Sequence, residues 1–328
     1  MSDTKTPLLI DVDTGIDDAL GLLYVCACNA VDLLGVSTVA GNVSLAKATR
    51  NTRAVLALAG RDDIPVWPGC ERSLLRRARD ASVVHGDTGL GYAVLPEPPA
   101  DAAPLNGVDQ IIACARAHRG ELVLVATGPL TNVAMALMRE PELPRMIKRF
   151  VLMGGAFREG GNVTPAAEFN IWHDPEAARM VFRGFGGAGA APLIAVGLDV
   201  TRQTRLLPEH LATLARQCAG ASHGPALMRF LDDATRHYFE FTEQREGARF
   251  FTMHDPLAIA AAIDLSLIET QSVAVDIETS GEMTSGMSVA DWRGVWGGNA
   301  NAEVAISVRA SAMIGEFLAA MERLARRF

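Results

Sequence analysis

Short apolar runs alternate with amphipathic stretches in the first part of the chain, and this alternation predicts strand and helix units. Apolar runs at 8–10, 31–39 and 64–67 are typical of buried strands. Between them, residues 19–27 and 44–59 have helical spacing, and the second stretch begins at a serine cap and ends before a glycine. A strand, helix, strand order of this kind predicts a parallel sheet.

The same alternation continues to the end of the chain. A helix over 108–117 leads into a central strand over 122–126. We predict further strands at 150–153 and 193–198, helices at 208–218, 225–244 and 311–326, and β structure from Gln271 onward. Residues 70–107 interrupt the pattern, and so long an irregular stretch is usually functional or mobile. Without an internal repeat or a linker, residues 1–328 are predicted to form a single large domain, an open, mostly parallel, Rossmann-like α/β sheet flanked by helices.

Composition narrows the classes of function. Hydrophobic residues make up 49% of the chain, but no uncharged apolar run is long enough for a membrane span, so we expect no membrane partner. The formal charge of −8, with arginines gathered only at 72–79, argues against a nucleic-acid surface. The start lacks the pattern of a signal peptide, and the five cysteines form no CxxC pair, so we expect a cytoplasmic protein.

Four aspartates fall within eight residues directly after the first predicted strand. Asp11 and Asp13 share one face of the strand end, and Asp17 and Asp18 fall near the first turn of the following helix. Gly15 marks the turn between them, at the strand end where open α/β sheets bind ligands. Two carboxylates ~4 Å apart repel by about 4 kcal/mol at an effective dielectric of ~20, which favours a bound cation. Oxygen ligands select Ca²⁺ or Mg²⁺ over zinc.

A plainer interpretation of the same aspartates stays open, in which Asp17 and Asp18 cap the helix and Asp11 ties down the strand end. Two distant segments favour the metal centre. Residues 127–132 follow the central strand and offer backbone carbonyls, which are good ligands for hard cations. Residues 253–256 place another acidic residue at a helix start.

The polar loop at 160–175 adds hydrogen-bonding groups of a different kind. Asn162, Glu168 and Asn170 suit a polyhydroxylated ligand, although asparagines also cap loops of their own. The chain shows no Lys or Arg clamp for phosphate. An acidic metal centre with such neighbours activates water and orients hydroxyls, which indicates a hydrolase.

Motifs along essentially the whole chain resemble, in order, those of the inosine-uridine-preferring nucleoside hydrolases: DVDTGIDD (11–18), GN (41–42), HG (85–86), TGPLTN (127–132), MGG (153–155), Asn162 through EFN (168–170), and HDP (254–256). Thr14 stands where many members carry proline. The resemblance implies Ca²⁺-dependent hydrolysis of the N-glycosidic bond of ribonucleosides to free base and ribose. It also implies a homodimer or homotetramer.

The resemblance also implies a role for each matching residue. The Ca²⁺ ligands would be Asp13, Asp18, Asp255 and the backbone carbonyl of Thr127, with Asp11 hydrogen-bonding the cluster. The ribose contacts would be Asp17, Asn42, Asn162, Glu168 and Asn170. A metal-bound water would attack C1′ directly through an oxocarbenium-like transition state, with Asp13 as general base. His254 would supply a proton or hydrogen bond to the departing base, and its alternative role is to orient Asp255.

The base side of the pocket is less well marked. His85, Met153 and Phe169 could line it, and Tyr238 with Thr242 could face it from one helix. No tryptophan pair is placed to sandwich a purine, and with His254 present we expect a broad or pyrimidine-tolerant enzyme.

Two other functions remain open. One is a haloacid-dehalogenase-like phosphatase with Asp11 as nucleophile, although Gly15 stands where that motif wants a small hydroxyl or branched residue. The other is a protein that binds nucleosides without cleaving them.

Overall fold

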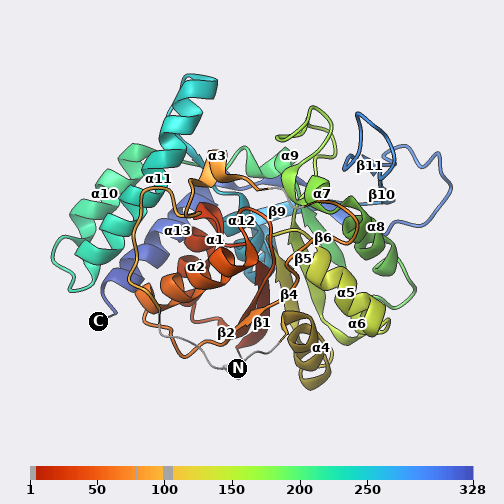
Figure 1. Cartoon of the computed structure of the whole chain (residues 1–328), viewed down its shortest axis with the longest axis horizontal. Helices are drawn as coiled ribbons and strands as arrows, with labels where there is room; N and C mark the ends of the chain where they lie inside the picture. Colours follow the sequence, from red (N-terminus) through yellow and green to blue (C-terminus); the bar gives the residue numbers. More distant parts are fainter. Residues whose placement is uncertain (1–4, 78–79, 99–105, 328) are drawn as a thin grey trace.

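An eight-stranded sheet separates two layers of helices in the computed structural model, which describes residues 5–77, 80–98 and 106–327 (Figure 1). Neighbouring strands are parallel except at the β12/β9 edge, where the pair is antiparallel. In spatial order the strands are β3 (Val66–Pro68), β2 (Val31–Thr38), β1 (Thr6–Val12), β4 (Val123–Ala126), β5 (Arg149–Met153), β6 (Leu193–Val196), β12 (Ala302–Val308) and β9 (Ile268–Val273). The predicted open, mostly parallel α/β sheet is confirmed.

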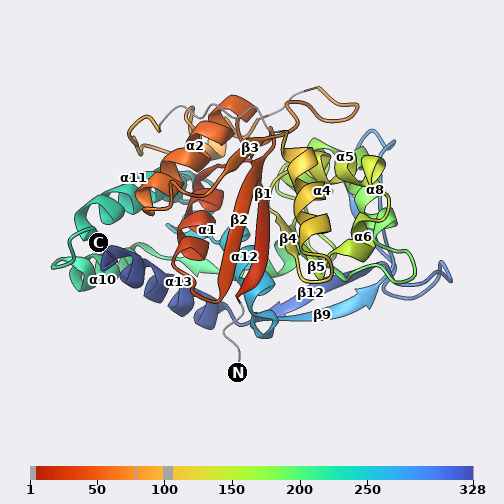
Figure 2. The same ribbon diagram turned by 90° about the horizontal axis from the view of Figure 1, so that it is seen from below.

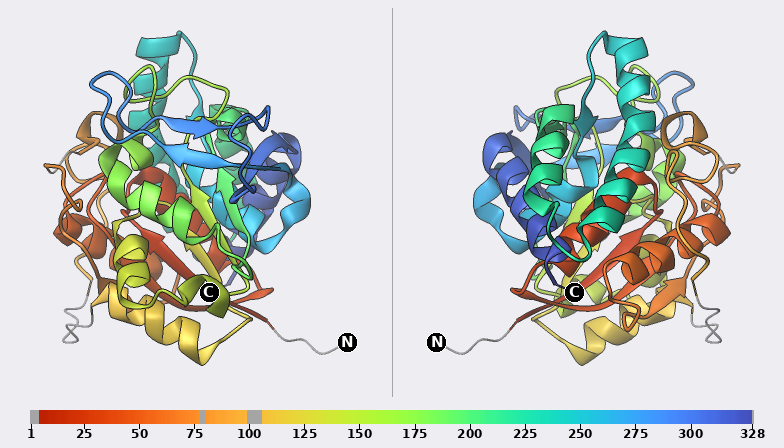
Figure 3. Two further views of the ribbon diagram at one scale, coloured as in Figure 1. Left: turned by 90° about the vertical axis from the view of Figure 1, so that its right-hand side faces the viewer. Right: turned by 90° about the vertical axis from the view of Figure 1, so that its left-hand side faces the viewer.

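Helices cover both faces of the sheet (Figure 2). One layer contains α1 (Ile16–Cys26), α2 (Leu45–Leu58), α10 (Pro208–Cys218), α11 (Gly224–Glu246), α12 (His254–Ile263) and α13 (Ala310–Ala325). The other contains α4 (Gly107–Ala117), α5 (Thr131–Arg139), α6 (Leu143–Met146) and α8 (Pro175–Gly184). Figure 3 shows α10 and α11 at one end of the molecule and a small hairpin, β10 (Val275–Ile277) with β11 (Ser288–Ala290), at the opposite end.

The period of two along β1 distributes its side chains between the two layers. Leu8, Ile10 and Val12 pack into the core on the α1 side, and Leu9 packs into the core on the α4 side. Asp11, two residues after Leu9, lies on the same face of the strand. At the strand end it is therefore on the α5 side, where it contacts Asn132. Burial on both faces explains why the strands read as continuous apolar runs.

Several predicted elements have different limits in the structure. Residues 193–198 were expected to form one strand, but β6 ends at Val196 and a short helix, α9 (Leu198–Thr201), follows. The polar loop at 160–175 contains the short helix α7 (Phe169–His173). Both helices are about one turn long, too short for a period of 3.6 to appear in the sequence. Periodic pattern therefore locates long elements and misses single turns.

The irregular stretch 70–107 contains a one-turn helix, α3 (Ser82–His85), and the first residue of α4. Part of its arginine-rich segment and most of its proline-rich run lie outside the described residues. Two strand pairs complete the elements: the hairpin already described, and β7 (Arg205–Leu206) with β8 (Phe251–Thr252). Within the described ranges, no helix is both long and apolar enough to cross a bilayer.

The strand order reverses between β1 and β4, because the chain first builds outward through β2 and β3 and then returns to the other side of β1. At such a reversal the connections leave the sheet in opposite directions, and the carboxyl ends of the two central strands are left uncovered. Asp11 and Asp13 follow β1, and Thr127 follows β4. The fold therefore places the acidic stretch and the TGPLTN segment next to each other.

Asn132, at the start of α5, ties three segments together beneath these strand ends. Its Nδ2 donates to Asp11 Oδ1 (2.7 Å) and to the Thr38 carbonyl (3.0 Å), and its Oδ1 accepts from the Cys70 amide (2.7 Å). The side chain is fully buried. A Cβ at Gly69 would lie 2.3 Å from Asn132 Oδ1, so glycine is needed there.

We expect Asn132→Ala to lower the free energy of unfolding by about 2–4 kcal/mol, because it leaves several buried polar groups without partners. Urea unfolding measures the change. Asn29→Ala, at an exposed site, is the control and should change stability by less than about 0.5 kcal/mol. Similar small losses in both variants would contradict the bridging role of Asn132.

Candidate functional site

Asp13 lies just past the end of β1 and is held by one neighbouring residue. Its Oδ2 accepts from the Asn42 backbone amide (2.6 Å), and its Oδ1 accepts from Asn42 Nδ2 (3.2 Å). Close packing also fixes it, because a Cβ at Gly41 would lie 2.1 Å from Asp13 Oδ2 and a Cβ at Gly128 would lie 3.0 Å from Oδ1. The two glycines form a close-fitting cradle that leaves the carboxylate little freedom.

Asp18 joins the start of α1 to the end of β4. Its Oδ2 accepts from the Gly15 amide (2.9 Å), and its Oδ1 accepts from Thr127 Oγ1 (2.7 Å). The Thr127 amide in turn donates to the Asp11 carbonyl (2.9 Å). Asn42 Nδ2 lies 3.3 Å from Asp18 Oδ2, so Asn42 contacts both Asp13 and Asp18.

A third segment brings Asp255, in the first turn of α12, to the same place. Oxygen atoms of Asp17, Asp18 and Asp255 all lie within 4.8 Å of one another, and all three residues are buried. At that separation two unit charges repel by roughly 3.5 kcal/mol at an effective dielectric of ~20. Among the described residues, Asp17 Oδ1 and Asp255 Oδ2 have no hydrogen-bond partner. A buried set of oxygen donors with orphaned atoms fits a hard divalent cation.

The pKa values of these carboxyl groups reflect burial among like charges. Burial raises the pKa of Asp17 and of Asp18 to about 6, and Asp17 adds to the rise at Asp18. Burial and neighbouring carboxylates hold the pKa of Asp13 and of Asp255 well above the usual range. Burial also raises the pKa of Asp11 to about 7, although bonds from Ser37 and Asn132 oppose it. Perturbed carboxyl groups that cluster at a strand edge are typical of functional sites.

The structure brings together the predicted metal residues, with one difference in detail. The close carboxylate group contains Asp17, which the resemblance gave to ribose, together with Asp18 and Asp255. Asp13 lies beside this group, and the nearby charge of Asp18 raises the pKa of Asp13. The Thr127 carbonyl accepts from Asn170 Nδ2 (2.8 Å), so this side of the site is polar as well.

The polar loop after β5 reaches the site through Glu168 and Asn170. Glu168 caps α7, since its two oxygens accept from the amides of Asn170 (2.8 Å), Ile171 (3.1 Å) and Gly155 (3.0 Å). Asn170 Nδ2 donates to the carbonyls of Thr127 and of Met153 (3.1 Å), which links the ends of β4 and β5. The backbone contacts make Glu168 an organising residue of the loop.

Asn162 holds the start of α7 from the other side of the loop. Its Oδ1 accepts from the Phe169 amide (3.0 Å), so its amide nitrogen is the group left for a ligand. Phe169 is itself buried, with its ring 5.7 Å from that of His173. Asn162 and Phe169 thus hold each other, and among these loop residues it is Asn170 that bonds the Thr127 carbonyl at the site.

Two histidines border the cluster from different elements. His85 Nδ1 accepts from the Ile16 amide (3.1 Å) and lies 3.8 Å from Asp17 Oδ1. Burial lowers the pKa of His85 to about 4. His254 Nδ1 hydrogen-bonds Thr201 Oγ1 (2.8 Å), and burial with the charge of Arg202 lowers its pKa to about 3. At both histidines burial favours the neutral ring.

Tyr238, on α11, also lies near the cluster. Its ring centroid is 4.5 Å from that of Phe251, and burial together with the charge of Asp17 raises its pKa. Thr242, one turn later, was expected to face the same side, but its hydroxyl donates to the Phe250 carbonyl (2.9 Å). That hydroxyl serves the backbone, because Thr242 is buried against the start of β8.

Thr201, Ser37 and Asn132 contact the candidate site but were not identified from the sequence. Ser37 Oγ donates to Asp11 Oδ1 (2.6 Å), and Thr201 bonds His254. Asn132 lies in the TGPLTN motif, so its place in that motif was the available signal. Ser37 and Thr201 carry no such signal, since their partners lie on elements far away in the sequence.

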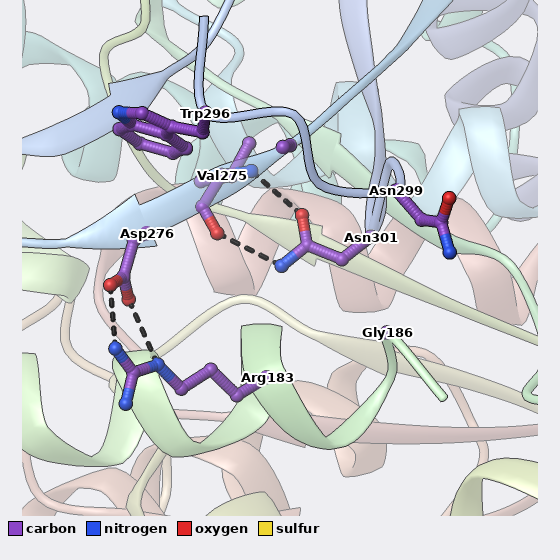
Figure 4. A pocket seen from close by; sticks show the side chains of 8 residues that line it. Arg183, Gly186, Val275, Asp276, Trp296, Asn299 and Asn301 are labelled. Atoms are coloured by element: carbon purple, nitrogen blue, oxygen red, sulfur yellow. Dashed lines mark hydrogen bonds and ion pairs between the residues drawn. The ribbon is translucent and has the colours of Figure 1, made fainter. Parts of the chain in front are cut away.

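A separate hollow of about 350 Å³ lies beside β10 and shares no lining residue with the acidic cluster (Figure 4). Arg183 binds Asp276 (2.7 Å), and Asn301 exchanges hydrogen bonds with the Val275 backbone. Arg183, Asp276 and Asn301 thus bind other lining groups of the hollow, and its lining residues form no set of reactive side chains.

Comparisons with known proteins identify the family of the chain. The family model described as inosine-uridine preferring nucleoside hydrolase matches residues 8–315. The chain is 36% identical to the inosine-uridine preferring nucleoside hydrolase of Crithidia fasciculata, over 97% of this chain and 98% of that protein. It is 37% identical to the pyrimidine-specific ribonucleoside hydrolase RihA of Shewanella woodyi, over 98% of this chain and 99% of that protein.

A solved structure is also similar along the whole length. The purine-preferring ribonucleoside hydrolase from Gardnerella vaginalis superposes with a TM-score of 0.90 at 31% identity, covering 98% of this chain and 100% of that one. The chain therefore belongs to the inosine-uridine preferring nucleoside hydrolase family, whose members hydrolyse the N-glycosidic bond of ribonucleosides.

Proposed function

We propose that this protein is a Ca²⁺-dependent ribonucleoside hydrolase in which water attacks C1′ directly, with no covalent intermediate. The observation that carries the proposal is the buried group of Asp17, Asp18 and Asp255, with Asp13 fixed beside it at the switch point of the sheet. Ribose hydroxyls and a water are the neutral oxygen groups that such a centre would orient.

The ion would be held by carboxylates of Asp13, Asp18 and Asp255 and by the Thr127 carbonyl. These are hard oxygen donors, which Ca²⁺ prefers in sets of six to eight, the remainder coming from water and substrate. When bound, Ca²⁺ supplies positive charge that offsets the carboxylates and offers coordination to the 2′ and 3′ hydroxyls. Asp11 supports this set from below through Ser37 and Asn132.

The ribose would be surrounded by Asp17, Asn42, Asn162, Glu168 and Asn170. As the base departs, positive charge develops at C1′, and nearby carboxylate and amide oxygens stabilise it. The nitrogen of Asn170 is committed to two carbonyls, which leaves its oxygen as the group to face the sugar. Glu168 contributes negative charge while its backbone contacts keep it in place.

Asp13 is the proposed general base, and it acts on the attacking water. The water oxygen bonds to C1′ while the bond from C1′ to the base nitrogen breaks and the electron pair leaves with the base. The water proton passes to Asp13, and the base takes up a proton from solvent. His254 donates a hydrogen bond to the departing base, which lowers the cost of its negative charge.

Base preference is proposed to be broad, with pyrimidines accepted. The similar proteins are named for inosine and uridine, for pyrimidines and for purines, so family membership leaves the base open. His85, Met153, Phe169 and Tyr238 are the proposed base-side residues. We further propose a cytoplasmic homodimer or homotetramer, which light scattering tests.

The phosphatase alternative finds no support in the geometry. Asp11 would have to serve as a nucleophile, but it is fully buried and its Oδ1 binds Ser37 and Asn132.

We expect Asp13→Ala to lower kcat for uridine and inosine by at least about 100-fold, since it removes the base that accepts the water proton. Release of free ribose measures the rate. Asp62→Ala, at an exposed site, is the matched control and should retain full activity.

A wild-type protein that binds nucleosides by calorimetry but releases no ribose would instead support a binding protein. Equal turnover of 2′-deoxyribonucleosides would contradict the proposed contacts to the 2′ hydroxyl.

Thermal unfolding tests the metal site separately. Ca²⁺ at 100 times its Kd should stabilise the wild type by about 2.7 kcal/mol. Asp255→Asn should abolish this response, because it removes one charged donor. Without added ion, the variant should unfold at a temperature no lower than the wild type, because it relieves repulsion with Asp17 and Asp18. Asp62→Asn is the control. An unchanged Ca²⁺ response in Asp255→Asn would exclude this residue as a ligand.

A further inference from the structure

The short helix α9 connects to several parts of the candidate site. Asp199 accepts from the backbone amides of Phe157 (2.9 Å), Arg158 (2.7 Å) and Glu159 (3.2 Å), and so holds the loop that follows β5. From the next residue after the helix, Arg202 Nη2 donates to the Gly161 carbonyl (3.0 Å). α9 therefore fixes the segment that leads to Asn162.

The same helix fixes the segment that carries His254. The Thr204 carbonyl accepts from the Met253 amide (2.9 Å), and the Thr201 carbonyl accepts both the amide (3.0 Å) and the hydroxyl (2.7 Å) of Thr204. Thr201 is fully buried, and its amide donates to the Gly197 carbonyl (3.1 Å). These backbone bonds hold Thr201 Oγ1 at 2.8 Å from His254 Nδ1.

A neutral imidazole has one N–H donor and one acceptor nitrogen, so the bond at Nδ1 decides what Nε2 can do. If the Thr201 hydroxyl donates to Nδ1, the ring proton sits on Nε2, which can then donate to a ligand. If Nδ1 donates to the hydroxyl, Nε2 is an acceptor and is repelled by a base that leaves with an electron pair. The Thr201 hydroxyl can either donate to Nδ1 or accept from it, whereas a leaving base requires that Nε2 carry the proton and hence that the hydroxyl donate to Nδ1.

We infer that Thr201 is a positioning residue whose hydroxyl donates to His254 Nδ1 and thereby keeps the proton on Nε2, directed to the departing base. This inference rests on the proposed function, because it assigns His254 its tautomer for that reaction. Thr201 touches no reacting atom, and its effect passes through the orientation and tautomer of the histidine.

The kinetic test compares substrates that differ in their need for this hydrogen bond. Thr201→Val, which keeps the shape and removes the hydroxyl, should lower kcat for uridine or inosine by about 10- to 100-fold with a smaller change in KM. 4-Nitrophenyl β-D-ribofuranoside releases a phenolate that is stable without a proton, so its kcat should change by no more than about twofold. Thr201→Ser should restore cleavage of the nucleosides. Thr235→Val, which removes a buried hydroxyl that donates to the Leu231 carbonyl within α11, is the matched control.

Equal losses on all substrates, or no recovery in Thr201→Ser, would show a merely structural role and overturn the inference. Nitrogen NMR of the histidine rings gives a readout that needs no turnover. With His254→Ala to assign the signal among the seven histidines, the wild type should show Nε2 protonated and Nδ1 unprotonated. A proton on Nδ1 in the wild type would also overturn the inference. If the wild type cleaves no riboside, the proposed function is wrong. The NMR measurement still decides which nitrogen of His254 carries the proton.

Discussion

Mutual repulsion among buried carboxylates is the constraint that the rest of this structure has to meet. Three carboxylates whose oxygens lie within 4.8 Å of one another resist burial, and the surrounding chain must hold them there. Oriented donors hold Asp18, through the Gly15 amide and the Thr127 hydroxyl, and Asn42 holds Asp13 beside the group. The proposed cation completes this balance, and the same ion would bring substrate hydroxyls to the site.

The strand ends that bring the carboxylates together are distinct from several of the segments proposed to contact substrate. The reversal of strand order leaves the ends of β1 and β4 uncovered, and Asn132, in the helix after β4, hydrogen-bonds β1 and β2. Several of the parts proposed to contact sugar and base come from later segments, namely the loop before α7 and the start of α12, whereas Asp17, Asn42 and His85 come from the first part of the chain.

Much of this arrangement follows from the sequence, and the exceptions have a common cause. The long strands and helices and the parallel sheet were predicted correctly, because burial on both faces of a sheet leaves a strong apolar pattern. The family was predicted correctly from the order of its motifs along the chain. The single-turn helices α7 and α9 were missed, since a single turn has no period to detect. Contacts such as Thr201 with His254 were missed too, because they join elements with no shared motif. The residue roles themselves remain predictions.

The position of Asp255 in α12 has a consequence for how the protein is made. During synthesis the acidic stretch at 11–18 leaves the ribosome early, whereas Asp255 emerges only after most of the sheet has been translated. The nascent chain thus carries an acidic segment that lacks one of the three clustered carboxylates until α12 packs against α1. Tight capture of the proposed cation would then be a late event in biogenesis, because it waits for α12.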